Sequence, residues 1–205
     1  HRGKMDTELT ATVRETIEAA VDTLIEDIAA NNLPEPCQNV WEDSIGQFTH
    51  TTATFIEAFA AVGRAPMGEA VQKRSLEAAD QLLDGLETLW DADLGVYVMG
   101  LTNGTPDHRV DAAALHLADA LQEYDSVEST VLTDRQLTRL ADHVSTTLDT
   151  LFRNPTESRV PGLARYEGDR WRTGHQDSEK IWTVTTAMGA LAAGRGGDMR
   201  NDRNA

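Results

Sequence analysis

The chain has 205 residues, with 34 Asp and Glu against 18 Lys and Arg, which gives a formal net charge of −16. A surface this acidic repels nucleic-acid phosphates and anionic lipid headgroups, so we expect neither nucleic acid nor a membrane as a partner. The single cysteine, Cys37, excludes an intramolecular disulfide and a cysteine-based zinc site. Dense surface carboxylates are typical of proteins that stay hydrated at high salt, and we therefore expect a halophilic protein.

The composition, 40% hydrophobic and 25% charged, is that of a globular protein. No apolar run approaches the roughly 18 residues that span a bilayer, and no signal-type stretch follows the first residues. These features predict a soluble, cytoplasmic protein. Because the first residue is His1 and not Met, we expect the chain to be part of a longer protein.

Six segments have helical periodicity, and amphipathic segments alternate along the chain with mostly apolar ones. The first is amphipathic. Pro34 and Pro36 end it, because proline disfavours helical geometry in the residue before it. The second has Glu57 as its only charge, and the last has no charge at all. A polar tail is expected over 195–205. In chain order the predicted helices are 9–28, 49–62, 66–90, 111–118, 132–152 and 181–193.

Alternation of charged-faced and apolar helices favours an all-α fold of the alpha/alpha-toroid type, in which each hairpin places one helix outside and the next inside a ring. Six helices would make about half of a ring of twelve, as a single partial domain over 1–205. A helical bundle or a helix-pair solenoid is the competing architecture, although no sequence repeat supports a solenoid. In a toroid the loops before the apolar helices meet at one end, which predicts a site built from residues 39–47, 108–111 and 165–180.

The first of these loops contains Trp41-Glu42-Asp43. A carboxylic acid beside an indole is an arrangement that raises a pKa by desolvation and offers a flat face to a sugar ring, as a glycosidic general acid requires. The alternative is structural: Asp43 or Ser44 caps the next helix and Trp41 belongs to the core.

The third loop reads Arg165-Tyr166-Glu167-Gly168-Asp169-Arg170-Trp171. Arginine and aspartate at this spacing can bind sugar hydroxyls, and Tyr166, Trp171 or Trp182 offers a ring face. The alternative is a salt-bridged surface loop. Asp111, in the second loop, can serve the site or simply cap its helix.

Other chemistries find little support in the sequence. The six histidines show no paired spacing such as HExxH, so we expect no metal and no cofactor. Gly194-Arg195-Gly196-Gly197 follows a helix, unlike a phosphate-binding loop, and Ser44 lacks the strand-turn-helix frame of a nucleophile elbow. Cys37 has no histidine nearby in the sequence.

The order of these pieces resembles glycoside hydrolase family 15, the glucoamylase-like family that includes glucodextranases and some trehalases. The resemblance covers residues 10–195. Departures from the family pattern are Asn39, where the family often has Asp or Gly, and Lys180-Ile181 before Trp182, where it has Asn-Pro. The matching pieces are Leu33-Pro34-Glu35-Pro36, Val40-Trp41-Glu42, Gly46, Phe48-Thr49, Val110-Asp111-Ala112-Ala113, Gly162-Leu163-Ala164-Arg165-Tyr166, Asp169 and Ile181-Trp182.

The resemblance implies inverting hydrolysis of α-glucosidic bonds from the non-reducing end of an α-glucan or oligosaccharide. By the family's pattern Glu42 is the general acid, Arg165 holds substrate hydroxyls and Asp111 supports the site. The remaining expected substrate-binding residues are Trp41, Asp43, Tyr166, Asp169 and Trp182.

An inverting enzyme needs a second carboxylate to activate water. The family's base follows the last helix present here, so we expect it beyond residue 205 and expect this chain alone to be inactive. Half a toroid exposes apolar flanks, which predicts self-association. Two alternatives remain: a trehalase or glucodextranase of the same family, and a non-catalytic module that binds glucan or a protein.

Overall fold

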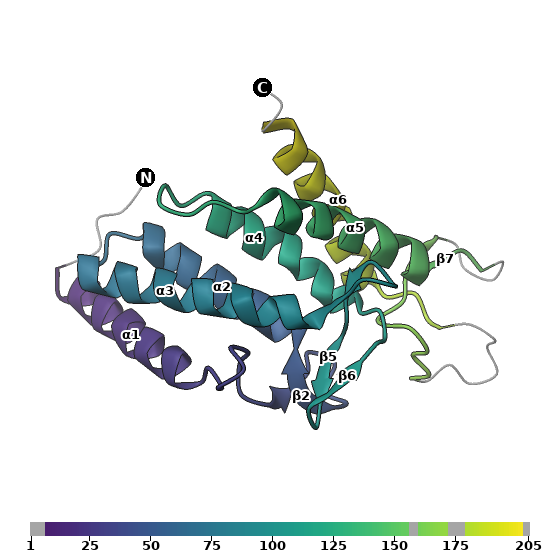
Figure 1. Cartoon of the computed structure of the whole chain (residues 1–205), viewed down its shortest axis with the longest axis horizontal. Coiled ribbons are helices and arrows are strands. Elements are labelled where there is room, and N and C mark those ends of the chain that lie inside the picture. The colour runs from purple at the N-terminus through teal and green to yellow at the C-terminus, as the bar shows by residue number, and fades with distance from the viewer. Residues whose placement is uncertain (1–6, 156–159, 172–178, 203–205) are drawn as a thin grey trace.

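The computed structural model describes residues 7–155, 160–171 and 179–202 (Figure 1). Helices occupy most of this range, and short strands lie in the connections between them. Strands β2, β5 and β6 gather at one end of α2, where the predicted loops come together. In chain order the elements are α1 (Thr7–Glu26), β1 (Cys37–Gln38), β2 (Ile45–Phe48), α2 (Thr49–Arg64), α3 (Glu69–Leu86), η1 (Glu87–Leu89), β3 (Trp90–Asp91), β4 (Val96–Tyr97), β5 (Gly100–Thr102), β6 (Thr105–Asp107), η2 (Ala112–His116), α4 (Leu117–Asp125), α5 (Asp134–Leu151), β7 (Phe152–Arg153), β8 (Gly162–Leu163) and α6 (Thr183–Asp202).

The prediction of an all-α toroid is wrong, because the described residues form a mixed fold with three antiparallel sheets. One sheet has four strands in the order β1-β2-β5-β6, and two others pair β3 with β4 and β7 with β8. The four-stranded sheet depends on two glycines that carry no side chain into the neighbouring strand. A Cβ on Gly46 would lie 2.4 Å from the Leu101 carbonyl oxygen, and one on Gly100 would lie 2.2 Å from that of Gln47.

All six predicted helical segments contain helix, with shifted bounds. Within the predicted segment 111–118, Asp111 caps the 3₁₀ turn η2, and η2 runs directly into α4, which ends at Asp125. A capping box fixes the start of α5, where Thr133 accepts from the Gln136 N–H and the Gln136 side chain accepts from the Thr133 N–H. Helix α6 continues to Asp202, so most of the predicted polar tail is helical. Arg195, paired with Asp119 of α4, anchors that extension.

The main core lies between α2 and the helices on either side of it, α3 and α4. Small residues let these helices approach closely: Ala53, Ala60, Ala79 and Ala120 are fully buried. The fit is tight at Gly63, where an added Cβ would lie 2.5 Å from a methyl group of Leu76. The apolar composition of 49–62 therefore reflects burial, as predicted.

Helix α6 begins with an uncharged segment, but only one side of it is buried. Thr185, Gly189 and Ala192 face the rest of the chain, whereas Val184 and Leu191 are 49% and 59% exposed. Within the described ranges, none of the helices combines the length and the apolar character needed to cross a membrane.

His143 of α5 is fully buried and links two other elements. Its Nδ1 accepts from the Tyr97 N–H at 3.2 Å and its Nε2 lies 3.1 Å from the Ala114 carbonyl oxygen. This pairing fixes the neutral tautomer with the proton on Nε2. Burial lowers the pKa of His143 to about 4.

We expect this histidine to make folding sensitive to acid. Its folded pKa lies below the unfolded value of 6.5, so the stability it supplies is complete above that value and is lost as the pH falls through about 4. When the pH is lowered from about 7 to about 5, the free energy of unfolding of the wild type should fall by about 2 kcal/mol more than that of His143→Gln. Urea unfolding at both pH values measures this difference. Parallel curves for the two proteins would contradict the expectation.

Candidate functional site

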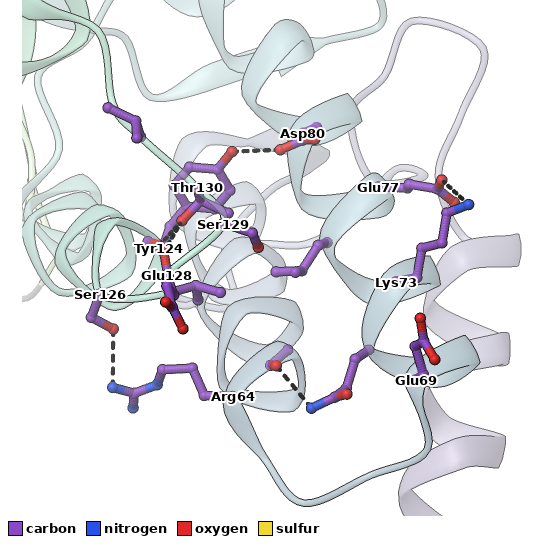
Figure 2. Close-up of a pocket in the computed structure, with 15 residues that line it drawn as sticks. Arg64, Glu69, Lys73, Glu77, Asp80, Tyr124, Ser126, Glu128, Ser129 and Thr130 are labelled. Carbon is purple, nitrogen blue, oxygen red and sulfur yellow. Dashed lines mark hydrogen bonds and ion pairs between the residues drawn. The ribbon is translucent and has the colours of Figure 1, made fainter.

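One cavity among the described residues lies away from the predicted site residues. It has a volume of about 930 Å³ and opens between the end of α2, the start of α3 and the segment after α4 (Figure 2). Four carboxylates and two cations line it, close to the 34-to-18 ratio of the whole chain, so its charge singles out no ligand. The labelled charged side chains are Arg64, Glu69, Lys73, Glu77, Asp80 and Glu128. Another cavity, of about 320 Å³, is lined by Trp90, Asp91 and His108 among others. His108 belongs to the second predicted loop, but neither Glu42 nor any of the expected substrate-binding residues lines this cavity.

The predicted site residues gather instead at the opposite end of α2. Between β1 and β2 the chain forms a tight loop that Asn39 organises. Its Oδ1 accepts from the Asp43 N–H at 3.1 Å, and its Nδ2 donates to Asp43 Oδ1 and Ser44 Oγ at 2.8 Å each. Glu42 occupies the left-handed region at φ 60°, which is uncommon for a side-chain-bearing residue and is often found at functional sites.

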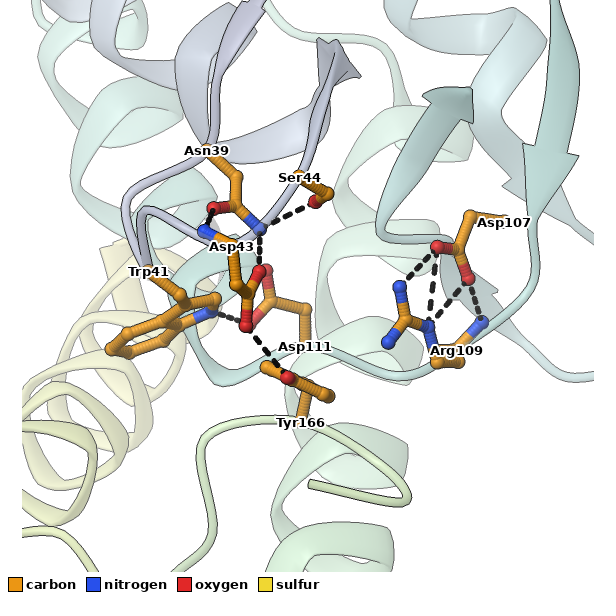
Figure 3. Close-up of polar contacts among 8 residues, drawn as sticks. All are labelled: Asn39, Trp41, Asp43, Ser44, Asp107, Arg109, Asp111 and Tyr166. Atoms are coloured by element: carbon orange, nitrogen blue, oxygen red, sulfur yellow. Dashed lines mark hydrogen bonds and ion pairs between the residues drawn. The ribbon is translucent and has the colours of Figure 1, made fainter. Parts of the chain in front are cut away.

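Two long-range hydrogen bonds tie this loop to the other two predicted loops (Figure 3). The Trp41 indole Nε1–H donates to Asp111 Oδ1 at 2.9 Å, and the Tyr166 hydroxyl donates to Asp43 Oδ2 at 2.7 Å. The second and third loops also join through their backbones, since the Ala112 N–H donates to the Arg165 carbonyl oxygen at 2.8 Å. The predicted convergence of the three loops is confirmed by these contacts.

Asp111 is almost completely buried at the centre of this junction. It caps η2, because its Oδ1 also accepts from the Ala113 N–H at 3.0 Å. Burial raises the pKa of Asp111 to about 7, against the opposing effect of the hydrogen bonds from Ala113 and Trp41. The structural alternative for Asp111 is therefore confirmed, and the same carboxyl holds the indole of Trp41 in place.

We expect Asp111→Asn to stabilise the chain in alkaline solution. The folded pKa lies above the unfolded value of 3.8, so the contribution of Asp111 is complete below 3.8 and is lost as the pH rises through about 7. Asparagine keeps the Oδ1 acceptor and carries no charge to bury. When the pH is raised from about 5 to about 8, the free energy of unfolding of the variant should increase relative to that of the wild type by about 2 to 3 kcal/mol. Urea unfolding at the two pH values checks this, and an unchanged difference would refute it.

Arg165 and Asp169 form a buried ion pair with two parallel hydrogen bonds. Arg165 Nε and Nη2 donate to the two carboxylate oxygens at 2.8 and 2.7 Å, and the side chains are only 5% and 1% exposed. Burial acts to raise the pKa of Asp169, but the hydrogen bonds from Arg165 and from the Trp171 N–H hold it below its usual range. The surface salt-bridge alternative for this loop is wrong.

Aromatic rings surround the Arg165 guanidinium. Its central carbon lies 4.9 Å from the ring centre of Trp182, 5.2 Å from that of Tyr166, and 5.6 Å from those of Trp41 and Trp171. Cation–π attraction and the Asp169 pairing together fix the position of this charge. The bidentate pairing uses Nε and Nη2, and no described residue accepts from Nη1.

Glu42 differs from its neighbours because its side chain is exposed and makes no hydrogen bond or ion pair with a described residue. The prediction that the Trp41 indole desolvates it is wrong: the Trp41 ring faces Arg165, and its N–H faces Asp111. The capping alternative is wrong too, since Phe48 occupies the N-cap of α2 and strand β2 separates Asp43 and Ser44 from the helix.

Arg109 and Asn39 also contribute to this junction, and although both lie inside the predicted loops, neither was among the predicted site residues. Arg109 lies over the Tyr166 ring at 4.9 Å and is held by Asp107 at 2.9 Å from its Nε. The i, i+2 spacing on an extended segment was the available signal, because it puts both side chains on one face. Asn39 appeared only as a departure from a family pattern. Among the described residues, His, Cys, Asp and Glu form no group of three or more suited to a metal ion.

Comparison with known proteins adds no relative: no protein-family model matches the chain, and no curated protein matches it. The functional interpretation therefore depends on the residues of the site and on the sequence resemblance described above.

Proposed function

We propose that this chain carries the acid half of an inverting α-glucosidase site, with Glu42 as the proton donor. The substrate class is α-glucans and their oligosaccharides, cleaved at the non-reducing end as the family 15 resemblance implies. The observation that supports this most is the convergence of three distant loops on one cluster of aromatic and hydrogen-bonding side chains. Glu42 lies in the chain between two members of that cluster, Trp41 and Asp43, and its exposed side chain has no hydrogen-bond or ion-pair partner among the described residues.

The members of this cluster suit the recognition of a sugar. Arg165 is held rigidly by Asp169, and its Nη1 provides N–H donors for ring hydroxyls. Trp41 and Trp182 supply aromatic surface beside that charge. Asp43, fixed by Asn39 and by the Tyr166 hydroxyl, supplies carboxylate acceptors. Bound sugar would cover the Glu42 carboxyl and exclude water from it, which the indole alone does not do.

In the proposed reaction the protonated Glu42 carboxyl gives its proton to the glycosidic oxygen. The bond from C1 to that oxygen breaks, its electron pair stays on the departing oxygen, and water adds to C1 from the opposite face. The water loses its proton to a second carboxylate. Asp43, Asp111 and Asp169 already accept hydrogen bonds within the cluster, so we propose that the base comes from outside the described residues.

Glucose release tests this proposal directly. The complete product of the gene that encodes this chain is incubated with maltose, longer maltooligosaccharides and trehalose in molar KCl, the condition that the acidic composition favours. Release from the maltose series supports the proposal, and release from trehalose alone would reassign the substrate within the family. Sugar binding without release from any of them would overturn the enzymatic role in favour of a binding module.

The proposed compartment is the cytoplasm. A single cysteine, half-buried near Thr51, is compatible with the reducing environment found there. Fractionation of the source cells with antibodies against the chain tests this, and recovery of the protein outside the cell would contradict it.

A further inference from the structure

Glu179 joins two segments that come from different parts of the chain. Its Oε2 accepts from Arg153 Nε at 3.0 Å, and its Oε1 accepts from the Gly168 backbone N–H at 3.0 Å. The ion pair is largely shielded from solvent, because the Arg153 and Glu179 side chains are only 21% and 14% exposed. Neither residue was singled out by the sequence analysis.

The backbone N–H that Glu179 accepts from belongs to the turn that carries the buried ion pair. This turn closes through the Asp169 N–H, which donates to the Tyr166 carbonyl oxygen at 3.2 Å, and Gly168 in it has φ 77°. Strand pairing already fixes the start of the turn, since the Glu167 N–H donates to the Val110 carbonyl oxygen at 2.9 Å. Glu179 fixes its other end, one residue before Asp169.

Arg153 gives this bracing a rigid base at the end of α5. Its Nη1 donates to the carbonyl oxygens of Thr150 and Phe152 at 2.7 and 2.8 Å, so the guanidinium is tied to the last turn of the helix. The hydrogen bond from Arg153 is the main reason that the pKa of Glu179 falls to about 2. The carboxylate is therefore ionised at neutral pH.

Glu179 also precedes the aromatic side chain that lies nearest to Arg165. Trp182 follows three residues later, and its backbone N–H donates to the Leu163 carbonyl oxygen at 3.0 Å. The Trp182 ring lies 5.2 Å from that of Trp171, centre to centre, and 4.9 Å from the Arg165 guanidinium carbon. The Glu179 carboxylate thus connects the turn that contains Arg165 and Asp169 with the segment that leads to Trp182.

We infer that Glu179 is a positioning residue that sets the geometry of Arg165 and of the Trp171–Trp182 pair by bracing the Gly168 turn against the end of α5. Glu179 acts through these side chains and touches no substrate. Its effect on sugar binding rests on the proposed function, whereas its effect on the indole pair does not.

The test compares Glu179→Ala and Glu179→Gln with the control Glu167→Ala in the complete gene product. Glu167 is an exposed glutamate in the same turn, and its side chain has no partner among the described residues. Two signals are followed: the far-ultraviolet circular-dichroism couplet of the two adjacent indoles, and the Michaelis constant for maltose. Urea unfolding shows that each variant is folded, and Glu179→Gln serves if Glu179→Ala does not fold, because glutamine keeps the Oε1 acceptor.

Glu179→Ala should lose most of the indole couplet and raise KM about tenfold with a smaller change in kcat, since a displaced binding group weakens substrate positioning. Glu179→Gln should show an intermediate loss, and Glu167→Ala should match the wild type. A wild-type couplet in both Glu179 variants would overturn the inference, as would an equal loss in Glu167→Ala. If the couplet is lost and no protein releases glucose, the positioning role stands and the proposed function fails.

Discussion

Glu42→Gln is expected to lower the kcat for maltose by at least about a hundredfold, because a positioned general acid contributes about 10² to 10⁴ in rate. Glutamine has nearly the shape of glutamate but has no acidic proton to give to the departing oxygen. The Glu42 side chain is exposed and makes no hydrogen bond or ion pair with a described residue, so its replacement should leave the fold intact. KM should change little, since the binding groups proposed here are Arg165 and its aromatic neighbours.

Glu35→Gln is the matched control for this experiment. Glu35 is another exposed glutamate in the segment before β1, and only its backbone N–H is engaged, by the Asp27 carbonyl oxygen at 2.8 Å. The same chemical change at this position should leave kcat and KM at wild-type values. Wild-type turnover by Glu42→Gln would remove Glu42 from the mechanism.

The second large effect is expected on stability. Asp169→Ala should lower the free energy of unfolding by about 3 to 5 kcal/mol, because it leaves the Arg165 guanidinium buried without its counter-charge. The aromatic rings around Arg165 soften this loss but cannot accept its N–H groups in the plane of the guanidinium. Urea unfolding at neutral pH measures the change.

A double variant separates the lost ion pair from other damage. Arg165→Met added to Asp169→Ala removes the stranded charge and should recover much of the stability, since a pair of buried charges replaced together costs far less than one partner alone. A loss below about 1 kcal/mol in the single variant would contradict the expected role of the pair. Equal stability of the single and double variants would show that the charge is not the cause.

The helices could be predicted because each has a strong local signal. The mostly apolar 49–62 segment and the regular leucines of 66–90 predicted α2 and α3 nearly in place. The strands could not, since β1, β3, β4, β7 and β8 have two residues each and show no periodicity. Strand pairing depends on glycines such as Gly46 and Gly100, where a side chain would clash with the neighbouring strand. This requirement is visible only in the folded structure.

The sequence predicted which loops come together, but it did not predict the environment of each side chain in them. Trp41, Asp111 and Arg165 belong to loops that lead into apolar segments, and that order was enough to bring them together. The sequence could not show that Arg165 is buried, that Glu42 is exposed, or that the Trp41 indole N–H donates to Asp111. These facts depend on contacts across about 70 to 120 residues, such as the hydrogen bond from Tyr166 to Asp43.

The most direct test of Glu42 as the proton donor compares two substrates in the Glu42→Gln variant of the complete gene product. Maltose needs a proton on its departing oxygen, whereas the fluoride of α-glucosyl fluoride leaves without one. We predict that the variant loses at least about a hundredfold in kcat on maltose and less than about tenfold on the fluoride. An equal loss on both substrates, or no loss on maltose, would contradict the proposed role of Glu42.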